Sequence, residues 1–175
     1  MEEILLVKKA IKGDRESFEN LINMYFDRLY KEAYIRCKYE EDAKEIVQET
    51  IYKAYKNIKS LKEPKYFKTW LSKILINVSN DYMSKHGMIE LQHDENDYIK
   101  EVHRDDKVEI KIDLYNAIDE LEDKYKDVII LRYLEDLKVE EISQILERPV
   151  NTIKTHIRKA IKDMKNLLKE DYIND

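Results

Sequence analysis

Residues that break helices are scarce in this chain: its 175 residues include two glycines and two prolines. Proline disrupts a helix interior strongly, and glycine does so moderately. Charged residues make up 39% of the chain and hydrophobic residues 43%, a composition that suits helices with one buried side. The sequence therefore predicts an all-α fold.

Residues 40–58 form a strongly amphipathic segment. When they are placed on a helix, the apolar residues recur on one side, which predicts a buried stripe of Ala43, Val47, Ile51, Ala54 and Ile58. The opposite side carries Asp42, Glu45, Gln48 and Glu49. The charge becomes positive at Lys53 and Lys56, an order that suits the helix dipole. We interpret the acidic side as a surface for a protein partner.

Lysines and aromatic residues alternate along the next stretch of the chain. The lysines are Lys59, Lys62, Lys65 and Lys68, and the aromatic residues are Tyr52, Tyr55, Tyr66, Phe67 and Trp70. A cationic groove lined with rings suits an unpaired nucleic-acid strand, because bases stack on rings and phosphates attract cations. Two alternatives stay open. Surface lysines commonly serve only solvation, and Phe67 and Trp70 also fit core positions beside Leu71 and Ile74.

A helix-turn-helix pattern lies in the second half of the chain. Residues 139–146 predict a short helix, residues 147–149 a break, and residues 150–160 a second helix. The contacts between the two helices are expected at Ile142, Leu146, Ile153 and Ile157. Only Asp163 opposes a run of bases over residues 148–169, which consists of Arg148, Lys154, Arg158, Lys159, Lys162, Lys165 and Lys169. A basic helix on an acidic chain indicates a local DNA contact, with a solvated amphipathic helix as the alternative.

These patterns resemble a known family. Residues 41–50, residues 66–71, the pair Ile76 and Asn77, and Asp81 are similar to sigma region 2 of the extracytoplasmic-function (ECF) RNA polymerase sigma factors. Residues 130–137 and the helix-turn-helix resemble sigma region 4 of the same family.

The resemblance implies two small helical domains, at residues 1–86 and 110–175, which are joined by a flexible acidic linker at residues 87–109. It implies a bacterial sigma factor that directs core RNA polymerase to specific promoters and assists promoter melting. The expected setting is an envelope or extracellular stress response.

The resemblance also implies which residues bind each partner. The core polymerase would be bound by Asp42, Glu45, Gln48 and Glu49. The minus-10 promoter element would be bound by Lys59, Lys62, Tyr66, Lys68, Asn77, Asn80 and Asp81. The minus-35 element would be bound by Arg148, Asn151, Thr152, Lys154, Thr155, His156, Arg158 and Lys159. An anti-sigma factor, often anchored in the membrane in this family, is a further expected partner.

The chain departs from the family pattern at two positions. Glu147 stands where the family often has glycine, so a left-handed backbone there would cost about 1 kcal/mol. His156 stands where an arginine is common. Because arginine grips a guanine edge with two hydrogen bonds and histidine does not, the base preference at this position cannot be transferred.

Other classes of protein fit the sequence less well. The single cysteine, Cys37, excludes an intrachain disulfide and a cysteine-rich zinc site, and it is expected to be a buried residue. The apolar run at residues 4–7 is too short for a signal peptide, so a cytoplasmic protein is expected. Residues 90–93 form an isolated E-x-x-H motif in the linker, whereas a di-metal helical bundle needs two such motifs on packed helices. We therefore expect that the protein is not an enzyme and that it binds no metal, no cofactor and no small-molecule substrate.

A stand-alone helix-turn-helix regulator is the alternative function. A basic helix-turn-helix would suffice for such a protein, whereas an acidic helix followed by a strand-binding zone would serve no purpose in it. The net charge of −5 also disfavours tight binding of duplex DNA by the chain alone.

Overall fold

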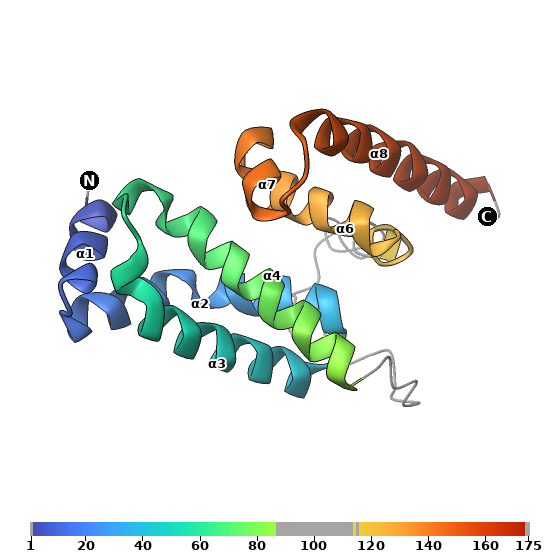
Figure 1. The fold of residues 1–175 in the computed structure, drawn as a ribbon. Coiled ribbons are helices and arrows are strands. Elements are labelled where there is room, and N and C mark those ends of the chain that lie inside the picture. The colour runs from blue at the N-terminus through green and yellow to red at the C-terminus, as the bar shows by residue number, and fades with distance from the viewer. Residues whose placement is uncertain (1, 87–113, 115, 174–175) are drawn as a thin grey trace. The chain divides into compact units, whose positions relative to one another are not determined.

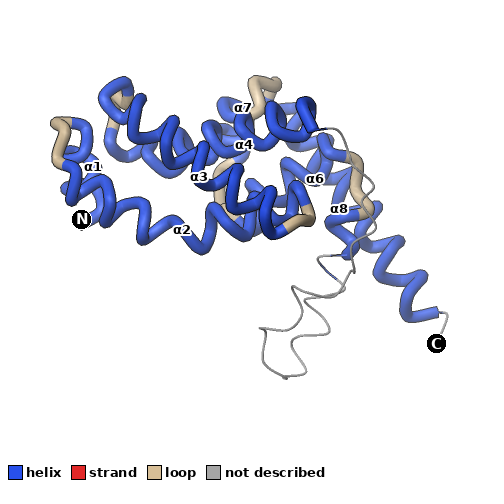
Figure 2. The backbone as a smooth tube through the Cα atoms, turned by 90° about the horizontal axis from the view of Figure 1, so that it is seen from below, coloured by secondary structure: helices blue, strands red, loops and turns tan. Residues whose placement is uncertain are grey.

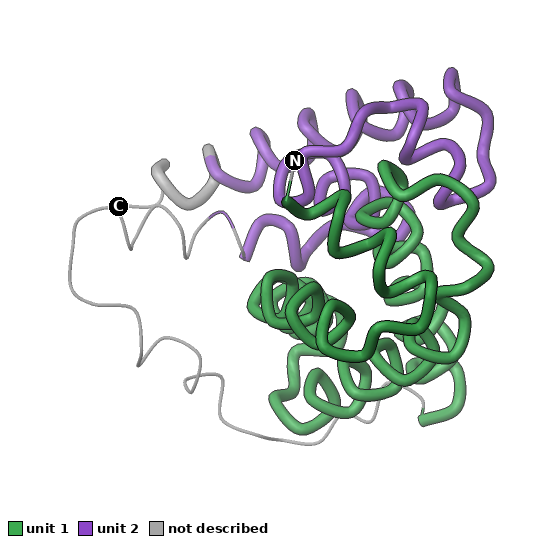
Figure 3. Tube along the Cα trace, turned by 90° about the vertical axis from the view of Figure 1, so that its left-hand side faces the viewer, with its two compact units in different colours: residues 1–88 green, residues 89–175 purple. Residues whose placement is uncertain are grey.

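The computed structural model describes residues 2–86, 114 and 116–173, and this part of the chain is helical without a strand (Figures 1 and 2). The all-α prediction is therefore confirmed. The chain divides into two compact units, Met1–Met88 and Ile89–Asp175, which we describe separately (Figure 3). The predicted linker at residues 87–109 lies outside the described residues, as does the E-x-x-H motif within it.

The first unit is a bundle of four helices. They are α1 (Glu2–Ile11), α2 (Arg15–Cys37), α3 (Glu40–Asn57) and α4 (Phe67–His86). Two short 3-10 turns connect α3 to α4, namely η1 (Ile58–Ser60) and η2 (Pro64–Tyr66). The long helix α2 packs against α1, α3 and α4, and α3 also packs against α4. This arrangement fixes one side of α3 against the bundle and leaves the other side exposed.

The core of the first unit follows the predicted stripe of α3. Ala43, Val47, Ala54 and Ile58 are buried, while Ile51 is half-buried. Ile46 and Thr50 are buried as well, so the buried side is wider than the predicted stripe. From α4, Phe67 and Leu71 enter the same core, whereas Trp70 and Ile74 are half-buried against it. Cys37 is buried as predicted.

Two left-handed residues shape the connections of this unit. Gly13 has a φ of 98° in the turn between α1 and α2, a conformation that glycine adopts without steric cost. Lys38 has a φ of 64° directly after α2, and its backbone N–H donates to the carbonyl of Tyr34 over 2.7 Å. Lys38 therefore ends α2 in the position where glycine is usual.

Charged side chains of α2 lie in the interior of the first unit. The carboxylate of Glu32, which is 2% exposed, forms an ion pair with Arg36 over 3.4 Å. Arg28 donates to the hydroxyl of Ser72 on α4 over 3.2 Å and lies 5.1 Å from the ring centre of Tyr25. Burial of charge is tolerated here because each group has a partner of suitable chemistry.

The second unit contains the helix-turn-helix. Residues 116–119 are helical, and they are followed by α6 (Asp123–Ile129), the π-helical turn η4 (Ile130–Leu134), α7 (Val139–Ile145) and α8 (Val150–Ile173). The second predicted helix thus extends well beyond residue 160. The helix at residues 116–119 is separated from α6 by a non-helical turn at residues 120–122. In η4 the N–H of Glu135 donates to the carbonyl of Ile130 over 3.0 Å, five residues earlier.

Candidate nucleic-acid and protein interfaces

The exposed side of α3 forms an acidic surface on the first unit. We define the acidic face as Asp42, Glu45, Gln48 and Glu49, of which Asp42 is half-buried and the other three are exposed. The neighbouring acids Glu40 and Glu41 share the single cation of Lys44, whose Nζ lies 2.6 and 3.1 Å from their carboxylates. These hydrogen bonds raise the pKa of Lys44, so it stays cationic.

Two side chains outside the predicted set contact the acidic face. The hydroxyl of Tyr82 on α4 donates to Asp42 Oδ1 over 2.9 Å and to Glu45 Oε2 over 3.2 Å. Lys53 Nζ lies 3.7 Å from Glu49 Oε1 and 3.8 Å from Asp81 Oδ2. The sequence alone does not reveal the contacts of Tyr82, because Asp42 and Glu45 precede it by 40 and 37 positions and no local pattern relates residues so far apart.

The residues predicted to bind the minus-10 strand fall in three places. Lys59 and Lys62 are exposed near the turns between α3 and α4. We define the α4 stripe as Tyr66, Asn77, Asn80 and Asp81, all exposed and spaced so that they share one side of α4 and the turn before it. Lys68 is half-buried and lies nine residues before Asn77, which is about 2.5 helical turns and therefore the opposite side.

Exposed rings accompany these cations. Tyr52, Tyr55 and Tyr66 are 55%, 51% and 43% exposed, and Tyr55 also meets Phe18 edge-on with 5.2 Å between the ring centres. Lys56 Nζ lies 5.3 Å from the ring centre of Tyr52, and Lys65 Nζ lies 4.8 Å from that of Tyr66. The combination of open rings and adjacent ammonium groups has the chemistry that a single strand requires.

The turn of the helix-turn-helix is closed by a reciprocal pair of hydrogen bonds. Ser143 Oγ donates to the carbonyl of Arg148 over 2.6 Å, and the backbone N–H of Arg148 donates to the carbonyl of Ser143 over 3.1 Å. Glu147 lies between them with a φ of 52°, the left-handed conformation considered from the sequence. Ile142 and Ile153 are fully buried where α7 meets α8.

The first turns of α8 present most of the residues predicted to bind the minus-35 element. The exposed ones on α8 are Asn151, Lys154, Thr155, Arg158 and Lys159, while Arg148 is exposed just before it and Thr152 is half-buried. Thr155 Oγ1 donates to the carbonyl of Asn151 over 2.9 Å. Lys159 Nζ is paired with Asp163 over 2.7 Å, which raises the pKa of Lys159.

His156 differs from the other predicted DNA contacts. It is half-buried, and its ring meets the ring of Tyr125 on α6 edge-on, with 5.3 Å between the ring centres. Burial, with the nearby charges of Arg148 and Lys124, lowers the pKa of His156 and favours the neutral ring. His156 therefore packs within the second unit in this structure.

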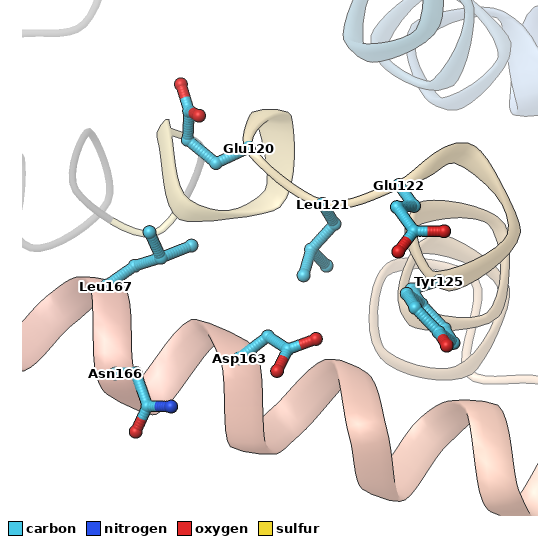
Figure 4. A pocket seen from close by; sticks show the side chains of 7 residues that line it. All are labelled: Glu120, Leu121, Glu122, Tyr125, Asp163, Asn166 and Leu167. Carbon is cyan, nitrogen blue, oxygen red and sulfur yellow. The ribbon is translucent and has the colours of Figure 1, made fainter.

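A shallow hollow of about 280 Å³ opens between the start of α6 and α8 (Figure 4). Its lining consists of Glu120, Leu121, Glu122, Tyr125, Asp163, Asn166 and Leu167. Two of its three carboxylates are already paired, Glu122 with Lys124 over 2.6 Å and Asp163 with Lys159.

Within residues 2–86 and 116–168, no group of three or more His, Cys, Asp or Glu is placed to hold a metal ion. No helix in the described part of the chain is long and apolar enough to cross a bilayer.

Known proteins resemble both units. Residues 21–88 match the family model for Sigma-70 region 2, and residues 111–164 match that for Sigma-70, region 4. The RNA polymerase sigma factor SigV of Bacillus subtilis (strain 168) is 38% identical over 143 residues, which cover 81% of this chain and 86% of SigV. This chain belongs to the RNA polymerase sigma factors. The ECF sigma factor SigW of the same organism is 30% identical over 179 residues, which cover 94% of this chain and 95% of SigW.

Solved structures show the same fold as this sigma factor. CnrH, determined in complex with the cytosolic domain of CnrY, has a TM-score of 0.74 at 20% identity, and the match covers 98% of this chain and 99% of CnrH. RpoE of Bartonella quintana, in complex with the anti-sigma factor NepR, has a TM-score of 0.72 at 21% identity over 88% of this chain and 98% of RpoE. The prediction of a sigma factor is confirmed, and the stand-alone regulator is not favoured.

Proposed function

We propose that this sigma factor docks on core RNA polymerase through the acidic face of α3. Three carboxylates and an amide share one exposed side of a helix whose other side is fixed in the core. Lys44 offsets part of the charge of Glu40 and Glu41, and Lys53 lies near Glu49, whereas Asp42 and Glu45 contact the uncharged hydroxyl of Tyr82, so the net negative charge of the face is concentrated at Asp42 and Glu45. Such a surface is complementary to basic side chains of the polymerase.

We propose that the minus-10 element is captured as a single strand beside this docking surface. The α4 stripe supplies amides and a ring, and Lys59 and Lys62 supply cations near its first turn. Stacking of an extruded base on a ring such as Tyr66 returns about 1 to 3 kcal/mol, which offsets part of the energy of melting. Lys68 is the weakest member of the predicted set because it faces away from the stripe.

We propose that α8 reads the minus-35 element in the major groove. Its first turns expose Asn151, Lys154, Thr155 and Arg158, a set of amide, hydroxyl and cationic groups suited to base edges and phosphates. The exposed Arg148 lies just before the helix and adds a phosphate contact. The division of labour between residues 1–86 and 110–175, with residues 87–109 as a tether, is part of this proposal.

We also propose control by an anti-sigma factor in the cytoplasm. CnrH was solved with the cytosolic domain of CnrY, and RpoE was solved with the anti-sigma factor NepR. A protein that covers the acidic face of α3 would block polymerase docking, and a membrane anchor on it would link release to an envelope stress. This chain would then carry no enzymatic activity and no cofactor.

The observation that carries the proposal is the exposed acidic face on a helix of a sigma region 2 fold. The test is in vitro transcription from a pool of genomic fragments with core polymerase from the organism that encodes this chain. We expect specific transcripts with the intact chain and none with the Glu45→Lys/Glu49→Lys variant. Alignment of their start sites would give the promoter sequence.

A matched control reverses two charges elsewhere in the same unit. Glu16 and Asp27 are exposed on α2, so Glu16→Lys/Asp27→Lys changes the net charge by the same amount away from the acidic face. This variant should transcribe like the intact chain. Equal loss in both variants would show a nonspecific charge effect. Sequence-specific DNA binding by the chain alone, with no new transcripts, would favour the stand-alone regulator.

A further inference from the structure

Tyr82 bridges two helices at the acidic face. It lies in the last turns of α4, and its single hydroxyl proton is shared between Asp42 Oδ1 at 2.9 Å and Glu45 Oε2 at 3.2 Å. On its other side the imidazole of His86 stacks on the phenol ring with 4.1 Å between the centres. His86 Nδ1 also lies 3.0 Å from the carbonyl oxygen of Tyr82. The phenol is thus held between the carboxylates and a stacked ring.

The shared proton opposes a repulsion on α3. Asp42 and Glu45 are three residues apart on one side of a helix, where like charges destabilise each other. A donor that reaches both carboxylates draws them to one point. Burial and the hydrogen bond to Asp42 raise the pKa of Tyr82, so the phenol keeps its proton at neutral pH. It therefore acts as a donor under all physiological conditions.

We propose that Tyr82 is a positioning residue that orients Asp42 and Glu45 for docking on the polymerase. The inference rests on the proposed function of the acidic face. Each carboxylate has about four lone-pair positions, so a bond from Tyr82 leaves acceptors open to a lysine or arginine of the polymerase. Carboxylates that are already fixed lose less side-chain entropy when they bind, and this preorganisation strengthens docking.

A second tie between the same helices supports this role. Lys53 on α3 lies between Glu49 and Asp81, and Asp81 directly precedes Tyr82 in α4. Adjacent residues of α4 therefore hold both parts of the acidic face, Tyr82 acting on Asp42 and Glu45, and Asp81 acting on Glu49 through Lys53. The hydrogen bonds of Tyr82 are shorter than the ion pairs of Lys53, so the experiment addresses Tyr82.

The experiment measures the affinity of core polymerase for the full-length chain by fluorescence anisotropy. Replacing Tyr82 by phenylalanine removes the hydroxyl and keeps the ring, so the stacking on His86 is retained. We expect Tyr82→Phe to weaken binding about fivefold, the size expected for the loss of one preorganising hydrogen bond. In an Asp42→Ala/Glu45→Ala background the same change should have no further effect, because its acceptors are gone.

The matched control removes another tyrosine–carboxylate hydrogen bond in the same unit. Tyr25 on α2 donates to Glu3 on α1 over 2.5 Å, so this bond involves neither of the helices that form the acidic face and its tie, α3 and α4. Tyr25→Phe should therefore lower stability and leave polymerase affinity unchanged. Wild-type affinity in Tyr82→Phe, or an equal loss in both backgrounds, would overturn the positioning role alone. Wild-type affinity in Asp42→Ala/Glu45→Ala would overturn the docking surface and the inference together.

Discussion

Replacing Glu147 by glycine should stabilise the second unit. Glu147 has a φ of 52° in the turn between α7 and α8, and its side chain is exposed. A residue with a Cβ pays about 1 to 2 kcal/mol in this conformation, and glycine pays about 0.5 to 1 kcal/mol more backbone entropy on folding. The difference is a net gain between about 0 and 1.5 kcal/mol, and its midpoint of about 0.75 kcal/mol corresponds to about 3 to 6 °C in Tm for a domain of this size.

The chain allows the two units to be followed separately. Trp70 is the only tryptophan in the sequence, and it lies in α4 of the first unit. Its fluorescence therefore reports the first unit, whereas circular dichroism at 222 nm reports helices of both units. For Glu147→Gly we expect the dichroism transition of the second unit to move upward while the fluorescence transition stays in place.

Two control variants sharpen this test. Lys38 has a φ of 64° after α2, so Lys38→Gly should raise the fluorescence transition instead. Glu140 is exposed in the first turn of α7, where a carboxylate suits the helix dipole and glycine is a weaker helix former, so Glu140→Gly should lower the transition of the second unit. If Glu147→Gly lowered that transition as Glu140→Gly does, the left-handed strain would not be the dominant cost at residue 147.

Four further changes have defined outcomes. Glu32→Ala removes the carboxylate that pairs with the Arg36 guanidinium, whose side chain is 7% exposed, and should cost about 3 kcal/mol in urea unfolding followed by fluorescence. Burial raises the pKa of the Cys37 thiol to about 11, and because this thiol is 2% exposed we expect a thiol reagent to modify it much more slowly in the folded chain than in the chain unfolded in urea. The raised pKa also means that stability is lost as the pH rises above the ordinary thiol pKa. Asp163→Asn frees Lys159 and should raise affinity for minus-35 duplexes about twofold at low salt only, as titrations would show. His156→Ala should lower the dichroism transition of the second unit and leave promoter preference in a selection unchanged.

Periodicity along the chain is sufficient to predict the helices that carry the interfaces. The apolar stripe and acidic side of α3 are separated because burial against α2 and α4 acts on every third or fourth residue, and this spacing is visible in the sequence. The same reasoning locates α7 and α8 through Ile142 and Ile153, which are fully buried. The left-handed conformation of Glu147 is raised only by the resemblance to the family, which often has glycine there, because glutamate itself does not favour this conformation.

Features that depend on contacts between distant residues are not predictable in this way. The bond between Tyr82 and Asp42 joins residues 40 positions apart, and its existence follows from how α3 and α4 pack. The position of His156 in α8 predicts a DNA contact, yet the ring of Tyr125 on α6 meets it. The spacing of the lysines groups Lys68 with its neighbours, although its side of α4 is half-buried. In each case tertiary packing determines the side chain's surroundings, while the DNA contacts of His156 and Lys68 stay predictions.

Some charged side chains of each surface already form ion pairs within the chain in the absence of a partner. Lys44 pairs with Glu40 and Glu41 on α3, Lys53 lies between Glu49 and Asp81, and Lys159 is paired with Asp163. Exposed pairs of this kind weaken the attraction that each surface exerts alone, and the net charge of −5 opposes free binding to DNA. Under the proposed function, specific binding depends on surfaces that act together on one polymerase, where the second contact gains from effective concentration. In such an arrangement a small preorganising contact, such as that of Tyr82, changes the occupancy of the whole complex.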